Sequence, residues 1–108
     1  MISQSRRSLV EDLPRNTPDP SYDWRRIAHL LHVSRALDEL EERVLVPERK
    51  VLYQFSARGH DMAQILLGSR LTDRHDAACG YYRSRPMLLS LGVDIEDALG
   101  SSMGRAGG

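Results

Sequence analysis

The fold is decided around the stretch Cys79-Gly80-Tyr81-Tyr82-Arg83-Ser84-Arg85-Pro86, which places phenols and guanidiniums between a run of small residues and a proline. Arg83 cannot lose its charge, and its planar guanidinium matches a phosphate or a carboxylate. Tyr82 adds a neutral hydroxyl donor beside it. Pro86 is typical of a helix start, where free backbone N–H groups favour anions. The stretch therefore indicates a small anion site, most simply a phosphate site, where a strand gives way to a helix.

A second interpretation of the same stretch is purely structural. Tyr81, Tyr82 and Arg83 would then form a surface turn in which the arginine pairs with a neighbouring acid. Short motifs match easily by chance, so the stretch taken alone favours the surface turn.

A long helix is predicted before this stretch. Asp23 or Ser21 can cap it, apolar residues recur at helical spacing from Trp24 to Val44, and Pro47 ends it near residue 45. Charged residues mark its expected solvent-facing side: Asp38, Glu39, Glu41, Glu42 and Arg43.

The rest of the chain predicts short elements. Residues 51–55 are predicted as a brief strand or an extended segment, and residues 77–80 as a buried strand. Helices are predicted over 61–71, over 86–91 with Gly92 as its end, and after the cap Asp94. Gly68 lets another element approach closely. The expected fold class is mostly α with one or two short strands.

Residues 1–20 are polar and carry three prolines, and they predict an extended or disordered arm in front of a folded domain over 21–108. The fifteen basic and fifteen acidic residues cancel, so no general attraction to nucleic acid or to an anionic membrane is expected. Cys79 is the single cysteine, which excludes an internal disulfide and favours a cytoplasmic protein. No apolar run has the length needed to span a bilayer.

A longer pattern resembles a known family. It consists of Tyr53-Gln54-Phe55-Ser56-Ala57-Arg58-Gly59-His60-Asp61-Met62-Ala63-Gln64, then Gly80-Tyr81-Tyr82-Arg83, then Leu91-Gly92-Val93. In order and spacing it is similar to the N-terminal part of the alpha-type chain of thiamine-diphosphate-dependent 2-oxo acid dehydrogenases. These are the decarboxylating components of the pyruvate and branched-chain complexes. The resemblance runs from about Trp24 to the last residue, and it implies the N-terminal fragment of an α/β thiamine-diphosphate-binding fold.

The resemblance implies a cofactor, thiamine diphosphate, and three residues that contact it. Tyr82 and Arg83 match the pair that holds the diphosphate, and Tyr53 matches an aromatic position beside the cofactor rings. Two positions depart from the common pattern. Arg85 and the proline after it replace the usual D-H-G, and Asp61 replaces a glutamate.

Other residues that the family needs do not occur in this sequence. The family binds Mg²⁺ through a G-D-G motif and a later asparagine, and its pyrimidine-activating glutamate belongs to a beta-type region. We therefore expect a domain incomplete at its C-terminus, with no catalytic or metal-binding residue of its own and no turnover alone. The implied partners are the remainder of the alpha-type domain, a beta-type region or subunit and a lipoyl-bearing acyltransferase. We also expect the isolated chain to be marginally folded or to self-associate.

An alternative function is a small non-enzymatic helical interaction module. The wide apolar face of the first helix and the missing catalytic residues support it.

Overall fold

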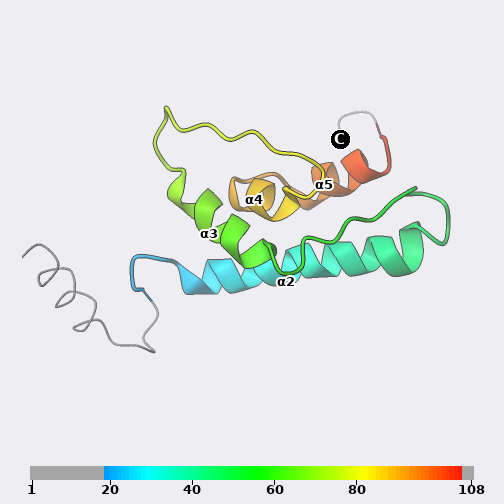
Figure 1. The fold of residues 1–108 in the computed structure, drawn as a ribbon, viewed down its shortest axis with the longest axis horizontal. Coiled ribbons are helices and arrows are strands. Elements are labelled where there is room, and N and C mark those ends of the chain that lie inside the picture. Colours follow the sequence, from blue (N-terminus) through cyan, green and yellow to red (C-terminus); the bar gives the residue numbers. More distant parts are fainter. Residues whose placement is uncertain (1–18, 106–108) are drawn as a thin grey trace, which may run out of the picture.

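The computed structural model describes residues 19–105 and shows a helical fold in that range (Figure 1). The elements are α2 (Trp24–Leu40), the π-helical turn η1 (Glu41–Leu45), α3 (Asp61–Arg70), α4 (Arg85–Ser90) and α5 (Ile95–Ser102). The predicted helices are therefore confirmed: the bounds of α3 and α4 lie within one residue of those expected, and the first helix reaches its expected end near residue 45 through η1.

The helix ends follow from local chemistry. The Asp23 carboxylate accepts a hydrogen bond from the Arg26 backbone N–H at 3.1 Å and so begins α2. The Asp94 carboxylate does the same for the Asp97 N–H at 2.8 Å and begins α5. Gly92 has a φ of +105°, a left-handed conformation that ends α4 in the way a glycine favours.

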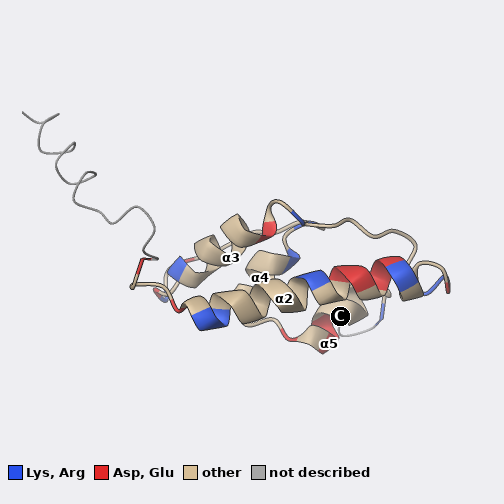
Figure 2. Ribbon diagram, turned by 90° about the horizontal axis from the view of Figure 1, so that it is seen from below, with Lys and Arg blue, Asp and Glu red and all other residues tan. Residues whose placement is uncertain are grey.

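α4 is the central element of the helical unit. It contacts α2, α3 and α5, while α3 also packs on α2. Figures 1 and 2 together show α3 and α5 on opposite sides of α4, with the longer α2 running along all three. The segment from residue 46 to residue 60 runs back along α2 before α3 begins (Figure 1).

One hydrophobic core joins these helices. Its buried members come from α2, α3 and α4, and they are Ile27, Leu30, Leu37, Ile65 and Leu89. The α2 members recur at the helical spacing expected from the sequence. Ala98 and Leu99 of α5 pack against this core while only partly buried.

Within residues 19–105 no strand is present, so the strand predicted over 77–80 is wrong, and residues 51–55 are an irregular segment rather than a strand. Ala77 to Gly80 are exposed rather than buried. A strand needs a neighbouring strand to pair its backbone groups, and two short segments do not make an independent sheet. The arm predicted over 1–20 falls, for residues 1–18, outside the described residues.

Gly68 confirms the predicted close approach between helices. A Cβ built on it would lie 1.7 Å from the Ser90 hydroxyl oxygen and 3.1 Å from the Met87 carbonyl oxygen. α3 and α4 therefore approach closely at the Gly68 backbone.

Candidate functional site

Aromatic side chains from two separate segments gather on one exposed surface. We call Tyr53, Phe55, Tyr81 and Tyr82 the aromatic cluster. The ring centroids lie 6.0 Å apart for Tyr53 and Phe55, 4.6 Å for Phe55 and Tyr82, and 5.1 Å for Tyr81 and Tyr82. Phe55 thus joins the predicted site residues Tyr53 and Tyr82. The sequence signal for Phe55 was its position two residues after Tyr53, since alternate residues of an extended segment share a face.

Arg83 lies against this cluster. Its guanidinium carbon is 5.6 Å from the Tyr82 ring centroid and 5.8 Å from that of Phe55, within range of a cation–π attraction. Its Nε is buried and has no hydrogen-bond partner within the described residues. A buried N–H without a partner is costly and calls for an acceptor. The structure therefore brings all three predicted site residues together.

The backbone of the tyrosine–arginine stretch is a tight turn. The Ser84 N–H donates to the Tyr81 carbonyl at 2.9 Å, and the Tyr81 N–H donates to the Ser84 hydroxyl at 3.0 Å. The Gln64 side chain of α3 donates to the Arg83 carbonyl at 2.9 Å. The stretch therefore forms a surface turn, as the second interpretation predicted. That interpretation also predicted an acidic partner for Arg83, but among residues 19–105 no carboxylate forms an ion pair with it.

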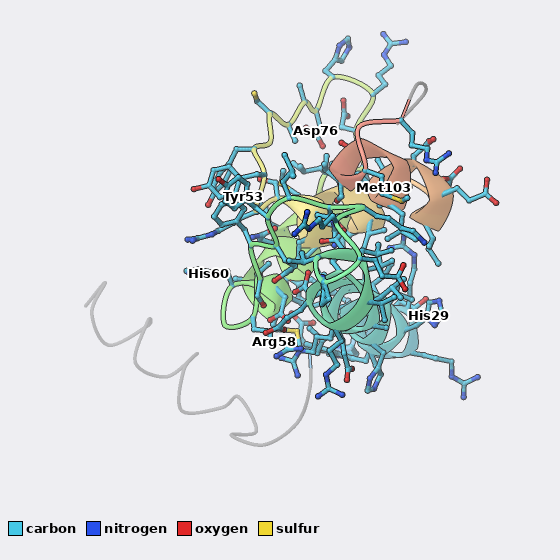
Figure 3. The ribbon with its side chains drawn as sticks, turned by 90° about the vertical axis from the view of Figure 1, so that its right-hand side faces the viewer. His29, Tyr53, Arg58, His60, Asp76 and Met103 are labelled. Atoms are coloured by element: carbon cyan, nitrogen blue, oxygen red, sulfur yellow. The ribbon has the colours of Figure 1, made fainter. Side chains whose placement is uncertain are left out.

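A cleft of about 760 Å³ lies beside the aromatic cluster. Tyr53 and Tyr82 line one side, and Ser102, Met103 and Gly104 line the other. Tyr53 and Met103 lie on opposite sides of the upper part of the molecule in Figure 3. Arg83 is not among the lining residues, so its guanidinium faces the cluster rather than the cleft.

Arg85 is a charged residue that lines the cleft, a role that the sequence did not predict. Its guanidinium donates to the Asp38 carboxylate at 3.4 Å, to the Glu41 carboxylate, and to the Ser102 hydroxyl at 2.6 Å. The Asp38 and Glu41 side chains are only 5% and 3% exposed. Their expected place on the solvent-facing side of the first helix is therefore wrong.

The error at Asp38 and Glu41 has a clear origin. Both residues fall on the same helical stripe as the buried Leu37 and Leu45, which was the available signal. Burial raises the pKa of Asp38 above its ordinary value of 3.8, although the Ser56 hydroxyl and the Arg85 guanidinium act in the opposite direction. Two carboxylates thus share one cation in the interior of the molecule, and Figure 2 shows the acidic residues grouped at this end of α2 between basic ones.

Within residues 19–105 the His, Cys, Asp and Glu side chains form no group able to hold a metal ion. Over the same range no helix has the length and apolar character needed to cross a membrane.

The three residues that the resemblance singled out differ in what they present at this surface. Arg83 has an N–H group without an acceptor, while the Tyr82 and Tyr53 side chains are largely exposed. A diphosphate presents the acceptor oxygens that such donors need. The magnesium that accompanies thiamine diphosphate would take its ligands from other residues.

Comparison with known proteins gave no relative. No family model, no curated protein and no solved structure matches this chain.

The Asp61 carboxylate at the start of α3 is buried and pairs with the Arg35 guanidinium, and this pair makes the stability of the fold depend on pH. Burial alone raises the pKa of this carboxyl, but the Arg35 guanidinium at 2.9 Å and the Met62 backbone N–H outweigh burial and hold it below its ordinary value of 3.8. A lowered folded-state pKa stabilises the fold above the unfolded value, and that stability is lost as the pH falls through the folded value. We expect the free energy of unfolding, measured in urea at a series of pH values, to fall below about pH 4 less steeply in Asp61→Asn than in the wild type.

The matched control is Glu42→Gln, which removes an exposed carboxylate from η1. It should leave the acid limb of the stability curve unchanged. Identical curves for Asp61→Asn and wild type would contradict the prediction.

Proposed function

We propose that this chain is the N-terminal part of a thiamine-diphosphate-dependent 2-oxo acid dehydrogenase and contributes contacts to the cofactor's diphosphate. The observation that carries the proposal is the gathering of Tyr53, Tyr82 and Arg83 at one exposed cluster, although about thirty residues separate the first from the other two. The sequence resemblance assigns cofactor contacts to the same three residues. That assignment used only sequence order and spacing, so the proximity of the residues supports it independently.

Each residue has a distinct role in this proposal. Arg83 binds the diphosphate through its guanidinium, for which the described residues supply no carboxylate partner. Tyr82 donates its hydroxyl to a neighbouring oxygen, and Tyr53 lies against the cofactor rings. When bound, thiamine diphosphate supplies the electron sink for loss of CO₂ from a 2-oxo acid, and the acyl group then passes to lipoamide. The chain's share is to orient the cofactor.

Other parts of the enzyme complete this proposal. The helical unit belongs to an α/β thiamine-diphosphate-binding fold whose remaining alpha-type residues bind Mg²⁺, and a beta-type region or subunit supplies the catalytic glutamate. A lipoyl-bearing acyltransferase accepts the product, in the cytoplasm. This chain alone is then inactive. The genomic reading frame beyond Gly108 is a direct check, because the proposal expects it to continue to a G-D-G motif and a later asparagine.

Arg83→Ala tests the proposal through cofactor affinity. Loss of a charge-assisted contact to a phosphate typically costs about 1.5–3 kcal/mol, or roughly ten- to a hundredfold in affinity. We expect that weakening when thiamine diphosphate with Mg²⁺ is titrated calorimetrically into the chain joined to the region that supplies the magnesium ligands. Tyr82→Phe should weaken binding less, because it removes one neutral donor and keeps the ring.

The control for this titration is Arg70→Ala. Arg70 is also an arginine over an aromatic ring, 3.9 Å from the Tyr22 centroid, but it lies at the far end of α3. Its loss should leave cofactor affinity unchanged. Unchanged affinity in Arg83→Ala would sink the proposed function and leave the tyrosine–arginine stretch as a surface turn.

A helical interaction module is the second candidate. Its support is the number of large apolar side chains left exposed beside the cleft, including Leu52 at 81% and Tyr53 at 74%. Such a patch marks an interaction surface in many proteins. The reading frame beyond Gly108 separates the candidates, since a module predicts a stop and no neighbouring dehydrogenase gene.

A further inference from the structure

α5 is the least embedded helix of the described chain. None of its residues is buried, and it meets the core through the half-buried Ala98 and Leu99 near its middle. The C-terminal end of α5 is attached differently. There the Ser102 hydroxyl accepts a hydrogen bond from Arg85 Nη2 at 2.6 Å. Removal of that bond would leave the end of α5 with few contacts that oppose its movement.

Arg85 is itself held rigidly. Its side chain is 16% exposed, and both of its acidic partners lie at the end of α2 and the start of η1. Glu41 opens the π-helical turn, in which the Val46 N–H bonds back to the Glu41 carbonyl at 2.8 Å. π-Helical turns are rare and recur at functional sites. Here the turn coincides with the carboxylate that anchors the arginine.

The same ion cluster also reaches the opposite wall of the cleft. The Ser56 hydroxyl donates to the Asp38 carboxylate at 3.1 Å, and Ser56 directly follows Phe55 of the aromatic cluster. Phe55 and Tyr53 line the cleft on that side, while Met103 and Gly104 line it on the α5 side. Asp38 and Arg85 therefore connect both walls of the cleft to one point on α2.

We propose that Arg85 is a positioning residue that sets the width of the cleft: it ties α5 to the end of α2, and it holds in place the Asp38 carboxylate that accepts from Ser56 on the opposite wall. Its charge is taken up by Asp38 and Glu41, so it acts through these contacts and does not bind an anionic ligand. The relevance of this width to thiamine diphosphate rests on the proposed function. The positioning role itself rests on the contacts of residues 38, 41, 56, 85 and 102.

Hydrogen–deuterium exchange on the full chain tests this role. In Arg85→Met we expect the amides of residues 99–105 and of 53–57 to exchange roughly ten- to a hundredfold faster than in the wild type. The amides of α3 should keep their wild-type rates, because the hydrogen bonds of the Arg85 side chain go to α2, η1 and α5. Arg83→Met removes a guanidinium two residues away and should leave residues 99–105 unchanged.

Two further variants keep the test decisive. Ser102→Ala removes only the hydrogen bond that attaches α5 to Arg85. It should therefore speed amide exchange at residues 99–105 and leave the exchange of residues 53–57 unchanged. This variant can be measured if Arg85→Met is too unstable to study. Arg85→Lys retains the charge without the branched set of donors, and it should restore the protection in part. Wild-type exchange at 99–105 in both Arg85→Met and Ser102→Ala would overturn the proposal, as would equal acceleration of every helix in both.

A separate titration keeps this inference distinct from the proposed function. Thiamine diphosphate with Mg²⁺ is added to the same Arg83 and Arg85 variants, each joined to the magnesium-binding region. Weakened binding in Arg85→Met together with faster exchange at 99–105 supports the role of cleft width. If the wild type binds no cofactor, the proposed function fails, and the exchange measurements still decide the role of Arg85.

Discussion

Ile65→Ala is expected to destabilise the fold by about 2–5 kcal/mol, a large share of the stability of a domain of this size. Ile65 lies at the centre of α3 with 0% of its surface exposed, and it packs among the core residues of α2 and α4. The substitution removes buried methyl groups and leaves a cavity that three helices border. Urea unfolding followed by circular dichroism measures the loss.

The matched control is Leu67→Ala on the same helix. Leu67 is 55% exposed, so its truncation should change the free energy of unfolding by less than about 1 kcal/mol. Ile65→Val should fall between the two, at about 0.5–1.5 kcal/mol. An Ile65→Ala protein as stable as the Leu67→Ala protein would show that the core does not lie between α2, α3 and α4.

The helices could be predicted from the sequence because the interactions that begin and end them are local. Asp23 and Asp94 each cap a helix through a backbone N–H three residues ahead, and Gly92 ends α4 through its own φ. A helix also displays its buried stripe within a single segment, as residues 27, 30 and 37 do. The two strands failed for the opposite reason, since strand pairing depends on a partner that the segment itself does not specify.

The ion cluster of Arg85 shows a second limit of sequence reasoning. Asp38 and Glu41 stood among other charged residues, and a run of charge normally marks a solvated face. Their partner lies more than forty residues away, so nothing local distinguished them from their exposed neighbours. The proximity of Tyr53 to Tyr82 was equally non-local, and only the sequence resemblance anticipated it.

The geometry of the candidate site also separates the two arginines of the opening stretch. Arg83 keeps a buried N–H without an acceptor, whereas the donors of Arg85 are met by two carboxylates and a hydroxyl. A guanidinium whose donors are already paired has little to offer a ligand, because ligand binding would break existing bonds. Of the two, Arg83 is therefore the arginine that we propose as the anion contact.

Gly68→Ala is expected to cost about 2–3 kcal/mol, although alanine is the better helix former by about 1 kcal/mol. The new Cβ would overlap the Ser90 hydroxyl, which donates to the Met87 carbonyl at 2.8 Å, and it would press on that carbonyl as well. Either the hydroxyl loses its bond or α3 and α4 move apart. Chemical denaturation of the variant measures the cost.

The paired substitution Gly68→Ala with Ser90→Gly isolates the cause. Ser90→Gly removes both side-chain atoms nearest the new Cβ, so the double variant should be more stable than the sum of the two single changes predicts. Residues in direct contact typically show such coupling at about 0.5–3 kcal/mol. Additive effects would mean that the two helices do not meet at Gly68 and Ser90.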